Sequence, residues 1–158
     1  MDERQLRKYQ SMLAISGMGV VLFGAWSIAK TILMMVYAPD RLVDAQVVDQ
    51  AGFSRLVFNA LMIAFLLPDL ILRMYVGLSA RAEAMGVRRG SGYIVIAWLM
   101  ALFLIFTVVS SVALFILYGD FGFSSLFDEV AIDAVNATSA SALIEVAVSA
   151  RRVKKLRG

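Results

Sequence analysis

Four apolar stretches, each long enough to cross a lipid bilayer, constrain this chain more than any other feature. A bilayer core of about 30 Å requires about 20 apolar residues in a helix that rises about 1.5 Å per residue. With 61% hydrophobic and 17% charged residues in 158, the chain is too apolar for a soluble domain of its size. We therefore predict an all-α polytopic membrane protein: a single domain over residues 1–158, an antiparallel bundle of four transmembrane helices with short loops. The predicted spans are 11–37, 56–78, 93–118 and 129–150.

Lysine and arginine are distributed unevenly between the two ends of these stretches. Of the 15 basic residues, all but Lys30, Arg41 and Arg55 lie in the N-terminal segment, around the loop after the second stretch, or in the C-terminal segment. Such clusters mark the cytoplasmic side of a membrane protein. A cleaved signal peptide would also follow basic residues, but the first apolar stretch is longer than a signal-peptide core. We predict a multi-pass protein of the cell membrane (plasma or inner membrane) with both termini cytoplasmic.

Two sequence features predict how the helices pack. Small residues let helix backbones approach closely in a bilayer, and Gly17, Gly24 and Thr31 recur every seven residues along the first stretch. They predict a seam for close packing on one face of that helix. In the second stretch, Pro68 cannot donate a backbone hydrogen bond to the carbonyl of Ala64, which predicts a helix kink at that point.

Charged residues inside the stretches cost about 2.5–3.5 kcal/mol each at the bilayer centre and are therefore expected to pair. At about 1.5 Å per residue, Arg73 and Glu145 lie at nearly the same depth, and Asp69 lies one helical turn from Arg73. We predict an inner polar cluster of Asp69, Arg73 and Glu145. The same arithmetic predicts an outer polar pair, Lys30 with Asp133, that has Asn59 at a similar depth.

These buried charges have two interpretations. Intramembrane acids commonly carry protons or ions through transporters and pumps, so the inner cluster could form a relay. The same contacts could instead lock the helices together, and Lys30 could extend toward the outer surface without a partner. We favour the structural lock for both groups of charges and keep the relay as the alternative.

The absence of two residue types limits the chemistry. The chain contains no cysteine and no histidine, which excludes thiolate nucleophiles, histidine bases and metal or haem sites built from these ligands. We find no catalytic, metal-binding, cofactor-binding or nucleic-acid-binding motif. We favour a non-enzymatic membrane interaction or assembly protein, whose partners are the lipid bilayer and either a second copy of the chain or another membrane protein. The alternatives are a small oligomeric transporter or channel that uses the carboxylate–arginine cluster, and an intramembrane enzyme that acts on lipid.

Overall fold

The structure, a computed structural model, describes residues 3–37, 55–118 and 123–157, and all of its regular structure there is α-helical. Each of the four helices is long and apolar enough to span a membrane, which confirms the prediction of four apolar helices. The two connections between the helices at residues 38–54 and 119–122 lie outside the described residues. The helices are α1 (Glu3–Tyr37), α3 (Arg55–Ala84), α4 (Gly92–Tyr118) and α5 (Phe123–Arg157).

All four helices reach beyond the predicted spans at one end or both. The largest extensions are at the start of α1, at both ends of α5 and at the end of α3. The extra turns at the start of α1, the end of α3 and the end of α5 are rich in alanine, glutamate, lysine and arginine, which favour helix without being strongly apolar. Helix propensity therefore carries these three ends beyond the apolar part that hydropathy located. The extra turns at the start of α5 have the sequence FSSLFD and do not follow this rule.

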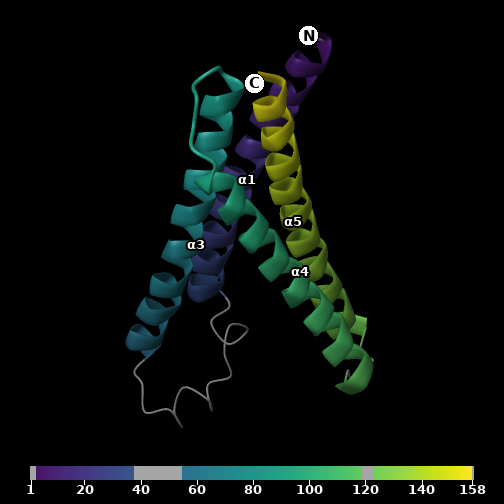
Figure 1. The fold of residues 1–158 in the computed structure, drawn as a ribbon. Helices are drawn as coiled ribbons and strands as arrows, with labels where there is room; N and C mark the ends of the chain where they lie inside the picture. Colours follow the sequence, from purple (N-terminus) through teal and green to yellow (C-terminus); the bar gives the residue numbers. More distant parts are fainter. Residues whose placement is uncertain (1–2, 38–54, 119–122, 158) are drawn as a thin grey trace.

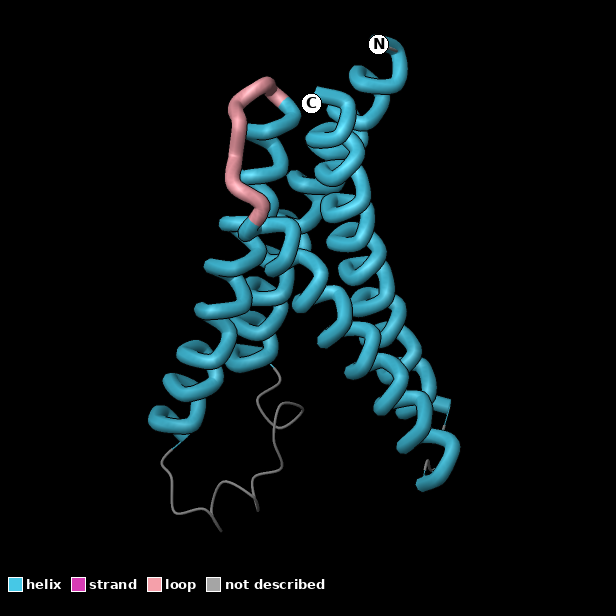
Figure 2. The backbone as a smooth tube through the Cα atoms, in the orientation of Figure 1, coloured by secondary structure: helices cyan, strands magenta, loops and turns pink. Residues whose placement is uncertain are grey.

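The helices form two pairs that meet at one end of the molecule and diverge toward the other (Figure 1). The helix α1 packs along α3, α4 packs along α5, and α1 also packs against α5. Both chain ends and the turn that joins α3 to α4 lie at the end where the pairs meet (Figure 2). The result is an inverted V with neighbouring helices antiparallel.

Burial follows this shape closely. Every buried residue among the described parts of the chain lies within 13–24, 73–83, 93–104 or 139–153. We call the part of the molecule formed by residues 3–24, 73–104 and 139–157 the closed half and the remainder the open half. The bundle predicted from the sequence is thus packed only in the closed half, because the two helix pairs separate beyond it.

Glycine allows the first pair to pack closely. Gly17 and Gly77 face each other across α1 and α3, and a methyl group on Gly17 would lie 2.9 Å from the carbonyl oxygen of Gly77. One step along the predicted seam, a methyl group on Gly24 would lie 2.9 Å from Cδ of Arg73. Thr31 does not extend this contact, because it is only half-buried and donates a hydrogen bond to the Ser27 carbonyl within its own helix (3.0 Å).

The helix α3 contains Pro68 and ends in a tight cap. Pro68 is exposed, and the helix continues on both sides of it. At the end of α3, Gly86 adopts a positive φ of 102°. Gly86 N donates to the Glu83 carbonyl (3.1 Å) and Val87 N to the Ala82 carbonyl (3.0 Å), the hydrogen-bond pattern of a Schellman cap. This cap turns the chain back toward α4 and holds Arg88 and Arg89 over the closed end.

The glycine contact predicts a large effect from a single methyl group. Gly77→Ala places its methyl group against the backbone of Gly17 and the side chain of Val21, so we expect a loss of about 1–3 kcal/mol in unfolding free energy. Gly19→Ala is the matched control, because it has no neighbour within 4 Å. Thermal unfolding in detergent measures both variants, and equal melting temperatures for the two would contradict the proposed close contact.

Candidate functional site

Arg73 lies where the two helix pairs begin to diverge, and its side chain is 8% exposed. Its Nε donates a hydrogen bond to Oδ2 of Asp69, one turn earlier in α3, at 2.7 Å. Its Nη1 donates to the hydroxyl of Ser139 in α5. Gly24 of α1 packs against the Arg73 side chain. One arginine side chain therefore joins three helices at the boundary between the closed and open halves: its guanidinium contacts α3 and α5, and its aliphatic part contacts α1.

Asp69 balances the charge of this arginine. A buried guanidinium without a counter-charge is very costly in a low-dielectric interior, and the short bond to Asp69 supplies both charge and an acceptor. The Asp69 side chain is 39% exposed and lines the space between the helix pairs. The pair is thus buried on the arginine side and accessible on the carboxylate side.

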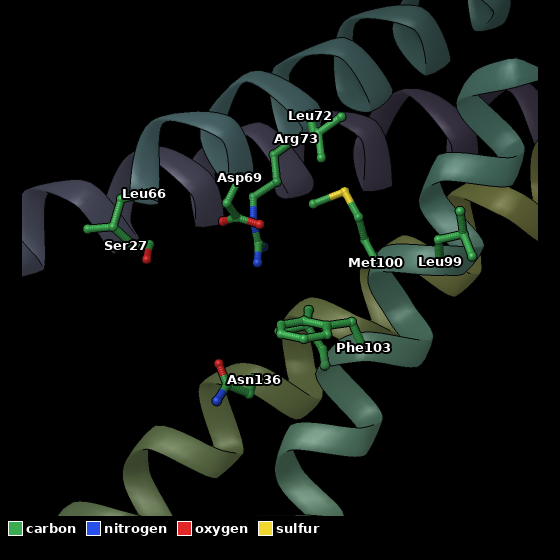
Figure 3. Close-up of a pocket in the computed structure, with 10 residues that line it drawn as sticks. Ser27, Leu66, Asp69, Leu72, Arg73, Leu99, Met100, Phe103 and Asn136 are labelled. Atoms are coloured by element: carbon green, nitrogen blue, oxygen red, sulfur yellow. The ribbon is translucent and has the colours of Figure 1, made fainter. Parts of the chain in front are cut away.

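Two cavities flank Arg73, and together they form what we call the interhelical cleft; Figure 3 shows the first of them. Ser27, Arg73 and Asn136 line both of them. The first has a volume of about 520 Å³ and is also lined by Leu66, Asp69, Leu72, Leu99, Met100, Phe103 and Leu104. The second has a volume of about 320 Å³ and is also lined by Phe23, Trp26, Lys30, Thr31, Met34, Ile132, Val135 and Ser139.

The cleft is mainly apolar with a polar centre. Figure 3 shows Asp69 and Arg73 directed toward each other from α3, with Met100 and Phe103 projecting from α4 and Asn136 from α5. Such a surface suits an elongated apolar ligand that carries a few polar groups. A helix with a small polar side chain at the right level has that character, and so does a lipid chain near its headgroup.

The structure brings together two of the three residues predicted for the inner cluster. Asp69 and Arg73 form the ion pair, but Glu145 is exposed and makes no ion pair among the described residues. Ser139 takes its place as the α5 partner of Arg73. The prediction placed the start of the last helix at residue 129, whereas α5 begins at Phe123. Measured from there, Ser139 lies about 24 Å along α5 and Arg73 about 27 Å along α3, so these two residues are level.

The outer polar pair does not form. Lys30 is exposed and lines the second cavity, where Ile132, Val135 and Asn136 of α5 lie opposite it. Asp133 is absent from that lining, and the described residues contain no ion pair between Lys30 and Asp133. Asn59 is half-buried on α3 and lines neither cavity. The reason is geometric, because Ile132, Val135 and Asn136 occupy the face of α5 that lines the cavity with Lys30, and Asp133 lies on another face of the helix.

A second polar cluster, which was not among the sequence predictions, lies at the closed end. The Glu83 side chain is 3% exposed, and its Oε2 lies 3.6 Å from Lys154 Nζ and accepts a hydrogen bond of 2.5 Å from the Tyr93 hydroxyl. Lys154 also donates to the carbonyl of Arg89 (2.6 Å). A helical-spacing signal was available, since Glu83 follows the buried Val76 and Ala80 at the spacing of one helix face.

The chain matches no family model, no curated protein and no solved structure. Function is therefore inferred from geometry and sequence. Within the described residues there is no group of three or more acidic side chains that could hold a metal ion. The interhelical cleft is the candidate site because its lining combines an apolar wall with the Asp69–Arg73 ion pair.

The two acids predicted for the inner cluster should differ in effect. Asp69→Asn removes the charge that balances buried Arg73, and we expect it to lower the unfolding free energy by about 1–3 kcal/mol, between the values for exposed and buried pairs. Glu145→Gln is the control, and a change within about 0.5 kcal/mol is expected at this exposed position. Chemical or thermal unfolding in detergent measures both, and a larger loss for Glu145→Gln would contradict the assignment.

Proposed function

We propose that the chain is an integral membrane protein that crosses the cell membrane four times with both termini in the cytoplasm. Four helices of sufficient length and apolarity support membrane insertion. The basic residues support the orientation, because the closed end carries the Lys- and Arg-rich segments around both termini and the α3–α4 turn. In this orientation the cleft opens toward the outer side of the membrane.

The orientation is testable by thiol labelling, because the native chain contains no cysteine. In intact cells, a membrane-impermeant maleimide should label Tyr37→Cys, which is exposed at the far end of α1. It should leave Arg4→Cys and Arg152→Cys unlabelled until the cells are lysed. Labelling of the two arginine positions in intact cells, with Tyr37→Cys protected, would reverse the proposed topology.

The second part of the proposal is that the protein acts by binding another membrane-embedded helix in the interhelical cleft, without catalysing a reaction. The supporting observation is the set of polar groups that the open half leaves facing the cleft, Ser27, Lys30, Asp69 and Asn136. Polar groups in contact with lipid tails are costly. A helix seated in the cleft would cover these groups and offer them hydrogen-bond partners.

A second copy of the chain is the occupant that we propose. The open part of α5 exposes Ala131, Ala134 and Ala137, and small residues of this kind permit close helix approach. Asn136 lies on the other side of α5, where it faces the cleft of its own chain. The alanine face of α5 could therefore enter a neighbouring cleft closely, where the Asn136 of that neighbour lies.

Filling the cleft should disrupt this association. Ser27→Phe places a bulky ring in the lining of both cavities, and we expect it to weaken dimerisation in bilayers at least about tenfold, a loss of about 1.4 kcal/mol. Ala113→Phe is the control, because Ala113 is exposed on the open part of α4 and lines neither cavity. Single-molecule photobleaching over a range of protein-to-lipid ratios gives the dimer fraction.

Two outcomes would overturn parts of this proposal. A wild-type chain that stays monomeric at every ratio would remove the second copy as occupant. A dimer that is unaffected by Ser27→Phe would place the interface on another surface. Either result would direct the search to a different membrane partner or a different face of the molecule.

A small oligomeric transporter or channel is the second candidate function. The observation that favours it is that the cleft opens at one end and holds an accessible carboxylate paired with arginine at its base. Rapid modification of Asn136→Cys by an impermeant thiol reagent added outside would show a water-filled path and support transport. Protection of this position would support a cleft filled by helix or lipid.

A further inference from the structure

The closed end contains a small cavity surrounded by basic side chains. Its volume is about 140 Å³, and it is lined by Arg88 and Arg89 of the α3–α4 turn, Lys154 and Arg157 of α5, and Glu83 of α3. Four cationic groups thus meet one acid around a single cavity. We call it the basic cavity.

Glu83 is fully engaged and balances only one of these cations. Its side chain is 3% exposed, it accepts the Tyr93 hydroxyl, and it pairs with Lys154. Lys154 is committed in turn, because it also donates to the Arg89 carbonyl. Glu83 and Lys154 therefore form a pair with no net charge at the bottom of the cavity. Three guanidinium groups, those of Arg88, Arg89 and Arg157, remain around it.

These three guanidinium groups retain most of their donors. The Arg157 side chain uses Nη2 to donate to the Glu83 carbonyl (2.9 Å), out of five N–H donors in a guanidinium. Among the described residues, the Arg88 and Arg89 side chains make no hydrogen bond or ion pair. Three like charges around one cavity repel each other unless an anion lies between them.

The chemistry of the basic cavity matches a phosphate group. Guanidinium forks bind the oxygens of phosphate in pairs, and a volume of about 140 Å³ equals the space of roughly five waters, enough for one phosphate but not for a nucleotide. We propose that the basic cavity binds a phosphate group, carried either by an anionic lipid headgroup or by a soluble phosphate ester.

The position of the cavity gives a lipid phosphate access to it. Glu83 lies five residues beyond the end of the predicted span at Leu78, which corresponds to about 8 Å along α3. The polar headgroup region extends about 5–8 Å beyond the hydrocarbon core on each side of a bilayer. Under the topology proposed above, the basic cavity lies at the depth of the headgroups of the inner leaflet, and a soluble ester reaches it from the cytoplasm.

The test uses the full chain in phosphatidylcholine nanodiscs, where both bilayer faces are accessible, with two separate probes, dilute phosphatidic acid and inorganic phosphate, at physiological salt. Arg88→Gln with Arg89→Gln should lower phosphate-dependent binding about tenfold. Arg4→Gln with Arg152→Gln is the matched control, since both arginines are exposed and lie outside the cavity while the loss of charge is the same. If the double variant fails to fold, the single variants Arg88→Gln and Arg89→Gln carry the test.

Each outcome has a defined meaning. Binding of phosphatidic acid alone supports a lipid headgroup as the ligand, and comparable binding of inorganic phosphate supports a soluble ester. The proposal is overturned if neither probe binds above the phosphatidylcholine background. It is also overturned if the control variant loses as much binding as the cavity variant, because the effect would then come from net charge.

Discussion

The burial of one guanidinium organises this molecule. Arg73 lies in the middle of an apolar helix, where a charge is stable only with partners close by. It finds its charge partner in Asp69 on its own helix and a hydrogen-bond partner in Ser139 on α5, and the missing side chain of Gly24 on α1 gives it room. The two helix pairs are packed together on one side of this arginine and separate on the other.

The closed half is consequently bounded by two polar clusters with an apolar core between them. Arg73, Asp69 and Ser139 form one boundary, and Glu83, Tyr93 and Lys154 form the other. Between them lie buried aliphatic and alanine side chains: Val76, Ala80, Ala97, Leu143, Val146 and Ala147. Aliphatic contacts tolerate small shifts between helices, whereas hydrogen-bonded pairs do not. The two clusters thus fix the register of α3 against α5 and α4, a role known for buried polar groups in other helical assemblies.

The sequence predicted what depends on one helix and failed where the result depends on two. The four helices follow from summed apolarity, and the Asp69–Arg73 contact follows from the fixed spacing of a helical turn. The prediction that Glu145 contacts Arg73 depended on where α5 begins, because depth along the helix is counted from its first residue. In the sequence Asp128 and Glu129 interrupt the apolar run, so the predicted span begins at Glu129, whereas the helix begins six residues earlier, at Phe123. Glu83 was missed because it lies beyond the apolar stretch, and its burial depends on α5 extending to cover it.

The same two-helix geometry is the physical basis for proposing that a partner fills the open half. In a soluble protein, water would hydrate Ser27, Asn136 and the free side of Asp69, and two splayed helix pairs would close to bury their aliphatic faces. In a bilayer, lipid solvates the aliphatic faces as well as protein does, so the apolar walls provide no force that closes the V. The polar groups at its base are the ones that lipid solvates poorly. They therefore set the chemistry of whatever fills the cleft: it must present hydrogen-bonding groups at the level of Arg73 and apolar surface beyond it.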